Sequence, residues 1–326
     1  MTYKVTLKAA ATIAAIALGA QGATAQELVL RTVTPFDAGN PLSKPIVLLK
    51  EVVERETNGR VEIKILGGPE VIPSLEQFDG LRNGVVDILQ GPVPYYVGAV
   101  PETFALLYTN QTSAEMRDSG LYQRMAELHD EKVDLHQWAI TSGQPGTAFR
   151  FYLKEPVETA DFTGLKIRVA ASTAAIVTAL GGTPVSIPFA DVYTALERGV
   201  ADGFGSTYTG IVEPGFPEVF DYVLQEPFYT LSGPILIRNE VWAGIPDDLK
   251  QELDRIAPIY EQIFADFTAQ SLAKEDEALR AAGIEFIELP AGEKEKFAST
   301  VLDIGWDAYA KIDPEGVNDL RALATK

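Results

Sequence analysis

The chain has 326 residues, no cysteine and a formal net charge of −19, and hydrophobic residues make up 46% of it. So negative a surface repels nucleic acid and anionic membranes, which excludes both as expected partners. Because disulfides are impossible, a sizeable core must hold the fold together, and the length is ample for two domains of ordinary size.

The first 25 residues are typical of a secretory signal peptide. Lys4 and Lys8 precede a short apolar run at 9–20, and residues 23–25 (Ala-Thr-Ala) supply a cleavage site. A membrane anchor is the alternative, but the run is shorter than the roughly 20 residues that span a bilayer. Cleavage removes two lysines and no acids, so residues 26–326 have a charge of −21. We therefore expect a soluble protein of the periplasm.

The first half of the remaining chain has a βαβαβ pattern. Apolar or alternating segments predict strands at 28–34, 60–65 and 85–90. Asn40 followed by Pro41 predicts one helix start, and Ser74 with Gln77 has the spacing of a capping box at the next.

A similar order recurs in the second half. Strands are predicted at 165–169, 183–187 and from 200, with a helix at 189–198. LRNGVVD, which ends in Asp87, resembles LERGVAD, which ends in Asp202. Either any helix-to-strand turn in a parallel sheet favours this string, or two lobes share one plan, as proteins with a cleft between domains often do.

The last third begins with a long predicted helix. Pro246 starts it, no glycine follows before 283, and at about 1.5 Å per residue its 37 residues would extend roughly 55 Å. Because this exceeds one small domain, we expect the helix to brace both lobes, with a kink at Pro258. A strand at 283–289 and an amphipathic helix follow. The predicted fold class is α/β, with two lobes and a ligand cleft between them.

Catalytic and metal-binding patterns are missing from the sequence. His129 and His136, the only histidines, lie in a polar segment and are interpreted as solvated surface residues. No glycine-rich phosphate loop follows a strand. We therefore expect no enzyme activity, no metal and no cofactor.

Two segments resemble a known family. DFTGLKIRVA (161–170) and GGTPVSIPFADVYTALERGVADG (181–203) are similar to the signature region of substrate-binding proteins of tripartite ATP-independent periplasmic (TRAP) transporters, of the dicarboxylate-binding type. The resemblance implies a monomeric periplasmic protein that captures a small organic acid and delivers it to a TRAP membrane permease. A periplasmic enzyme acting on an acid, or a ligand sensor without a transport role, is the alternative.

Arg168 is the main candidate ligand residue. It occupies the position of the family's carboxylate-binding arginine, and on its strand it shares a face with Lys166. A guanidinium offers two parallel N–H donors that match a carboxylate, so the chemistry agrees. Arg150 is near the family's second arginine, although it is equally compatible with a surface position.

The other candidates are aromatic or hydroxyl side chains. The resemblance places Phe189 in the pocket, and Ser206 and Tyr208 follow a strand where the family often has an amide, acid or aromatic residue. In the first lobe, Phe36 and Tyr95 follow strands whose ends should face the cleft, although core packing explains them equally well.

The predicted boundaries place the signal peptide at 1–25. Lobe 1 comprises 26–147 with about 235–273, and lobe 2 comprises 148–234 with about 274–326. The chain would cross between lobes near 145–150 and 235–240, which are the expected hinges.

Overall fold

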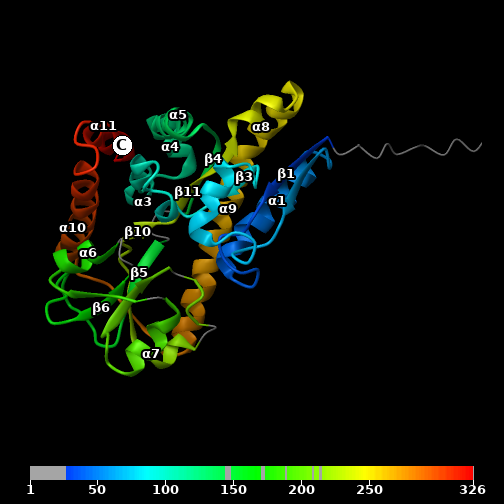
Figure 1. The fold of residues 1–326 in the computed structure, drawn as a ribbon. Helices are drawn as coiled ribbons and strands as arrows, with labels where there is room; N and C mark the ends of the chain where they lie inside the picture. The colour runs from blue at the N-terminus through cyan, green and yellow to red at the C-terminus, as the bar shows by residue number, and fades with distance from the viewer. Residues whose placement is uncertain are drawn as a thin grey trace, which may run out of the picture.

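The computed structural model describes residues 27–143, 148–169, 173–187, 189–207, 209–212 and 215–325. Two α/β lobes lie one above the other in Figure 1, and the long helix α9 (Asp247–Ala281) passes from one to the other. The predicted fold class is confirmed. The predicted signal peptide lies outside the described residues.

The first lobe is built on two small sheets that lie edge to edge. Strands β1 and β2 are parallel, and β11 pairs antiparallel with β3 and β4. The backbone N–H of Asp87, just before β3, donates to the carbonyl of Arg31 on β1 at 2.8 Å, so β3 continues the first sheet. The strands are β1 (Leu28–Thr32), β2 (Val61–Ile65), β3 (Ile88–Gln90), β4 (Leu135–Ser142) and β11 (Ser232–Arg238).

Helices surround these sheets. They are α1 (Lys44–Glu56), α2 (Gln77–Arg82), α3 (Ala105–Tyr108), α4 (Ser113–Ser119), α5 (Leu121–Val133) and α8 (Asn239–Gly244), with 3-10 turns at Pro41–Ser43, Ser74–Glu76, Val93–Tyr95 and Pro101–Phe104.

The second lobe contains one mixed sheet in the order β12-β9-β5-β8-β6-β7, with β10 paired to β5. Its strands are β5 (Ala148–Leu153), β6 (Lys166–Val169), β7 (Thr183–Ser186), β8 (Gly203–Ser206), β9 (Tyr222–Leu224), β10 (Tyr229–Thr230) and β12 (Glu285–Ile287). Helices α6 (Ala174–Ala179) and α7 (Val192–Glu197) and 3-10 turns at Phe189–Asp191 and Phe216–Glu218 complete it.

Helix α9 braces both lobes, as predicted. Its N-terminal half packs Leu253, Ile256 and Tyr260 into the core of the first lobe, where each is almost fully buried. Near its C-terminus, Leu279 joins the apolar cluster of the second lobe. Because one rigid element belongs to both cores, the lobes are coupled through its length.

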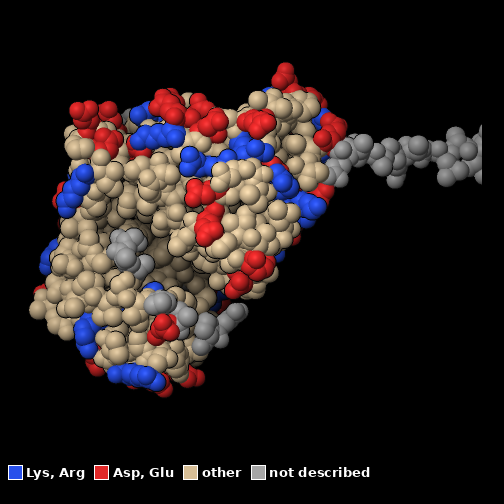
Figure 2. All heavy atoms as spheres, viewed as in Figure 1, with Lys and Arg blue, Asp and Glu red and all other residues tan. Residues whose placement is uncertain are grey.

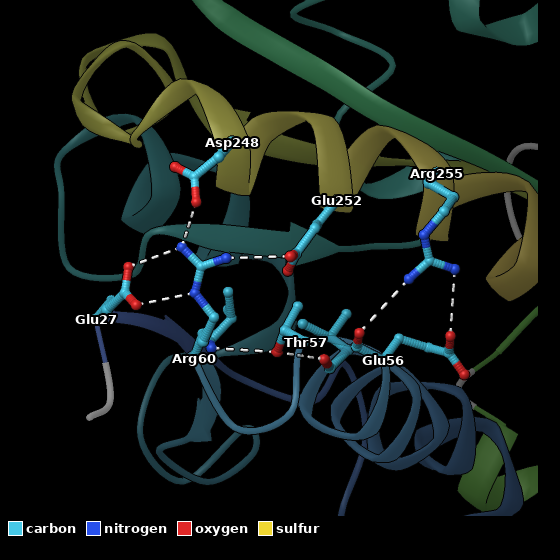
Figure 3. Close-up of polar contacts among 9 residues, drawn as sticks. Glu27, Glu56, Thr57, Arg60, Asp248, Glu252 and Arg255 are labelled. Atoms are coloured by element: carbon cyan, nitrogen blue, oxygen red, sulfur yellow. Dashed lines mark hydrogen bonds and ion pairs between the residues drawn. The ribbon is translucent and has the colours of Figure 1, made fainter. Parts of the chain in front are cut away.

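The start of α9 is also tied to the first lobe by charge. Figure 3 shows the guanidinium of Arg60, which precedes β2, among three carboxylates. It pairs with Glu27 at 2.9 Å and with Asp248 and Glu252 of α9 at 2.6 and 3.1 Å. These pairs are partly exposed, so they contribute modestly.

The boundaries between the lobes differ from the prediction in two places. Strand β10 pairs within the second lobe while β11 pairs within the first, so the chain crosses at Leu231 rather than at 235–240. Helix α10 (Ala291–Ala310) contacts α6 of the second lobe and also α3 and the 3-10 turn Pro101–Phe104 of the first. Helix α11 (Val317–Ala324) contacts α3, α4 and α5 of the first lobe. The sequence had assigned all of 274–326 to the second lobe; it could not show these contacts, because α11 is amphipathic and suits either surface.

The likeness between the two halves extends beyond the shared turn sequence. The unit β1-α1-β2-α2-β3 has β1 between β2 and β3, and β6-α6-β7-α7-β8 has β6 between β7 and β8. In each unit a glycine with positive φ ends the second helix, Gly84 at +78° and Gly199 at +69°.

Each unit has a corner where its second helix turns into its third strand, and the same hydrogen bonds join both corners to the first strand of the unit. In the first, Arg31 N–H donates to Asp87 Oδ2 at 3.0 Å, and Arg31 Nη2 donates to the Gly84 carbonyl at 3.0 Å. In the second, Lys166 N–H donates to Asp202 Oδ2 at 2.8 Å, and its Nζ donates to the Gly199 carbonyl at 2.9 Å. The two halves are thus lobes built on one plan.

The helix starts were predicted with mixed success. Asn40 Oδ1 accepts from the Leu42 N–H at 2.9 Å, which confirms the cap. Ser74 and Gln77 do not form a capping box. Instead Ser74 Oγ donates to the Pro35 carbonyl, and Gln77 Nε2 donates to the Thr34 carbonyl at 2.8 Å. Both side chains hold the end of β1 because tertiary partners replaced the local ones.

Candidate functional site

Arg168 lies near the carboxyl end of β6 with its guanidinium held in place. Its Nε and Nη2 atoms donate to the carbonyl of Ile187 at 2.9 and 2.8 Å. The Ile187 carbonyl follows β7, the neighbouring strand, so the sheet itself provides the support. Among the described residues no other acceptor is bonded to this guanidinium, and the edge of a guanidinium matches a planar anion such as a carboxylate.

The charge of Arg168 is buried, and no carboxylate among the described residues pairs with it. The residue is 7% exposed, and burial lowers the pKa of its guanidinium. In the described ranges no aspartate or glutamate pairs with it, whereas most other arginines of the chain have a carboxylate partner. A buried unpaired cation is costly, and an anion at its free edge would offset that cost.

Arg150 has a partner already. It lies on β5 opposite Ser206 of β8, and its Nη1 pairs with Asp276 of α9 at 2.7 Å. The residue is 6% exposed, and its buried Nε has no hydrogen-bond partner in the described structure. Arg150 therefore lies beside the predicted site, but the α9 carboxylate neutralises its charge.

Phe189 forms the aromatic side of the site. Its ring centroid is 5.7 Å from the guanidinium carbon of Arg168, within the range of a cation–π contact. It stacks on Phe216 at 5.3 Å and is still 41% exposed, so part of its face is open. Ser206 ends β8 and is half-buried. Tyr208 lies outside the described residues.

A cavity of about 120 Å³ lies between the lobes. Figure 2 shows this face hollowed between the upper and lower lobes. Phe36 and Leu42 of the first lobe, Phe149 and Thr207 of the second, and Phe264 of α9 line the cavity. Phe36 thus lies where it was predicted. Arg168 and Arg150 do not line the cavity itself but lie on the strands that end beside it.

Tyr95 supports Phe36 rather than lining the cavity. Their rings meet edge to face at a centroid distance of 6.3 Å. Tyr95 is half-buried, and this burial raises the pKa of its hydroxyl. Both residues therefore belong to one aromatic wall of the first lobe.

Sequence reasoning missed several cavity residues. Gln90 and Thr141 end β3 and β4, and Phe264 lies on the apolar stripe of α9 that was interpreted as a brace alone. The rule that cleft residues follow strand ends could have found Gln90. Nothing local to Phe264 distinguishes it from a core residue.

Two larger hollows lie elsewhere on the molecule. One of about 560 Å³ is lined by Glu127, Asp130 and Asp254 and also by Arg117, which pairs with Glu261 at 2.7 Å. Another of about 540 Å³ is lined by Glu115 and Asp118 among others. No group of three or more metal-ligating side chains occurs in the described ranges. Nor does any helix found there have the length and apolar character to cross a membrane.

The histidines are not solvated, contrary to the prediction. His129 is fully buried, and its Nδ1 lies 3.1 Å from Gln137 Oε1. His136 stacks on Trp242 at 3.9 Å. Burial lowers the pKa of each to about 4, so both are neutral at pH 7. The aspartate, glutamate and lysine around them suggested a surface helix. In the structure His129 lies on the buried face of α5 and His136 lies on β4.

Comparison with known proteins places this geometry in a family. A sequence model of the bacterial extracellular solute-binding proteins, family 7 (DctP), matches residues 34–311. The chain is 24% identical over 324 residues to the C4-dicarboxylate-binding periplasmic protein DctP of Rhodobacter capsulatus, which covers 93% of each chain.

Solved structures of similar fold include two TRAP periplasmic solute binding proteins. One from Rhodobacter sphaeroides, in an apo open form, has a TM-score of 0.78 and 22% identity, covering 91% of this chain and 98% of that one. One from Roseobacter denitrificans, with bound L-galactonate, has a TM-score of 0.69 and 20% identity, covering 91% and 99%. These likenesses support the two-lobed fold.

Proposed function

The chain belongs to the bacterial extracellular solute-binding proteins of family 7, and we propose that it captures a small organic acid and delivers it to a TRAP membrane permease. The observation that carries this proposal is the buried, uncompensated guanidinium of Arg168, held by the Ile187 carbonyl beside the cleft. A bound anion would offset the cost of this buried charge.

The named relatives agree with an acidic ligand. One is named for C4-dicarboxylates, and the other was solved with L-galactonate, which is also a carboxylate. Arg168 would anchor the carboxylate, Phe189 and Ser206 would contact the ligand from the second lobe, and Phe36 would cover it from the first. Arg150 would position the neighbouring strand, because Asp276 already occupies it.

The remaining parts of the proposal concern location and partners. The signal-like segment 1–25 would direct the chain to the periplasm and then be removed. The mature protein would act as a monomer and would release its ligand chemically unchanged, because the family is one of binding proteins and not of enzymes. The permease would recognise the closed form.

Native mass spectrometry of protein purified from the periplasm tests this function directly. We expect one small acid per chain, recovered unchanged, and a melting temperature that rises when the acid is added. Turnover of the acid into a product would support the rival enzyme. No bound acid and no thermal shift with a broad acid library would exclude the binding function.

Closure on binding is a further expectation. The chain crosses between lobes after β4 and again at Leu231, and α9 joins both cores. Rotation about these crossings would bring Phe36 toward the Arg168 side of the cleft. Small-angle scattering should therefore give a smaller radius of gyration at saturating ligand, and an unchanged profile would indicate a rigid protein.

A further inference from the structure

We propose that the ligand is a monocarboxylate with an apolar body, such as a short branched chain or a single aromatic ring, and not a dicarboxylate or a sugar acid. This inference rests on the proposed function, since it assumes that Arg168 binds a carboxylate. It arises from three features of the cleft: its count of cations, its walls and the state of its polar groups.

The first feature is the charge of the two arginines on the strands beside the cavity. Arg168 has no carboxylate partner in the described ranges, while Arg150 is neutralised by Asp276 at 2.7 Å. No lysine or arginine is among the described residues that line the cavity.

One cation can balance one carboxylate. A second carboxylate in the cleft would lose its hydration without gaining a counter-ion, and the chain's net charge of −19 would oppose it further. The cleft therefore selects against a dicarboxylate at pH 7.

The second feature is an apolar wall. The cavity side chains from the first lobe, the second lobe and α9 are mainly hydrocarbon, namely Phe36, Leu42, Ile46, Phe149, Leu231 and Phe264. Phe189 adds an open aromatic face next to Arg168. Such a wall favours a ligand body that is itself apolar, and an aromatic face can stack on a ring.

The third feature is that the polar groups of the cavity are already hydrogen-bonded to one another. Gln90 Nε2 donates to Thr141 Oγ1 at 3.1 Å, and Thr141 Oγ1 donates to the Gly233 carbonyl at 2.9 Å. Ser232 Oγ donates to the Thr141 carbonyl at 3.0 Å. The Tyr260 hydroxyl lies 2.8 Å from Gln90 Oε1.

A sugar acid would bring several hydroxyls to this wall. Each would lose its hydrogen bonds to water and find its possible partner already occupied, and a polar group buried without a partner disfavours binding. An apolar body has no such groups to satisfy. The side chains of Gln90, Thr141 and Ser232 thus bond to each other and to the backbone rather than to a ligand.

Calorimetry at pH 7 on ligand-free protein tests the inference with four acids: phenylacetate, 4-methylpentanoate, succinate and galactonate. At least one of the two apolar monocarboxylates should bind ~10-fold or more tightly than succinate and galactonate, since hydrophobic pockets discriminate about 10–200-fold per methylene-sized group. If succinate or galactonate binds best, and Arg168→Ala abolishes that binding, the proposed function stands and this inference is wrong. If none of the four binds, this inference is wrong, and the proposed function fails only if a broad acid library also gives no binding.

A matched pair of variants locates the effect. Phe36→Ala removes part of the apolar wall, and Ile312→Ala removes an exposed side chain that does not line the cavity. Phe36→Ala should weaken the preferred acid ~10-fold while changing succinate affinity little, and Ile312→Ala should change neither. Equal loss for both acids in Phe36→Ala would contradict a role of the wall in selecting the ligand body.

Discussion

The two lobes share one backbone plan but differ in charge at the cleft. In both corners the backbone N–H of a basic residue on a strand donates to an aspartate, and its side chain donates to a glycine carbonyl. This residue is Arg31 in the first lobe and Lys166 in the second. Two residues further along each strand the lobes diverge. The first has Val33, which is fully buried, and the second has Arg168. The matching position thus carries a core side chain in the first lobe and a cation in the second.

On the proposed function, this difference would place recognition of the carboxylate in the second lobe. The second lobe would hold the carboxylate in the open state, and the first would close over the ligand body. The corners are alike because they set the positions of the strand ends. The side chain two residues beyond the basic residue, Val33 or Arg168, gives each strand end its polarity.

The largest effect is expected from removing Arg168, the cation that distinguishes the second lobe from the first. Truncating one partner of a buried charge pair typically costs on the order of 2–5 kcal/mol. Arg168→Ala should therefore weaken acid binding roughly 30-fold to several thousandfold. Arg168→Lys keeps the charge but loses the bond pattern to Ile187 and the planar edge, so it should also bind poorly.

Calorimetry on both variants, with circular dichroism as the check on folding, decides the matter. If Arg168→Lys binds like the wild type, the two-pronged geometry is unimportant. If Arg168→Ala does too, the carboxylate is bound elsewhere.

A second test compares the aspartates of the two corners. Asp87 accepts from Arg31 and also pairs with Arg238 at 3.2 Å, whereas Asp202 accepts mainly from the backbone of Lys166. Asp87→Asn should lower the free energy of unfolding by about 2 kcal/mol, because two guanidinium groups lose their shared anion. Asp202→Asn keeps an oxygen acceptor and should cost less than about 1 kcal/mol. Urea denaturation measures both, and equal losses would show that the ion pairs add nothing.

The same pair predicts a pH dependence. Burial raises the pKa of Asp87, but the hydrogen bonds from Arg31 and Arg238 outweigh it, so the pKa is lowered overall. A lowered carboxylate pKa stabilises the fold above the unfolded value of about 3.9, and the effect is lost as pH falls through the folded value. The stability gap between wild type and Asp87→Asn should be constant from pH 7 to 5 and shrink below pH 4. A gap that grows on acidification would contradict this sign.

The smallest expected difference is between the two corner glycines. Both have positive φ, so alanine is strained at either position, by about 1 kcal/mol. A Cβ at Gly199 meets open space, but one at Gly84 would lie 3.0 Å from Arg238 Nη1. Gly84→Ala should therefore be slightly more destabilising than Gly199→Ala in thermal unfolding. A reversed order would mean that the Arg238 side chain moves without cost.

Local patterns were sufficient for much of the fold. Alternating apolar residues predicted β2 and β6, a long stretch without glycine predicted α9, and the repeated turn strings indicated two similar lobes. Arg168 could also be proposed from sequence as a ligand residue, because its strand face and its match to the family motif needed no distant residue. These features depend on neighbours along the chain, which is why the sequence alone determined them.

Only the tertiary structure decided which polar groups are free. Arg150 has the same chemistry as Arg168, but Asp276, which is 126 residues away on α9, pairs with it. Arg168 bonds the Ile187 carbonyl instead and has no carboxylate partner among the described residues. His129 is buried and Ser74 caps no helix because α5 and β1 bring distant partners to them. The sequence determines which side chains can carry a charge. Their counter-ions and their exposure depend on contacts that only packing creates.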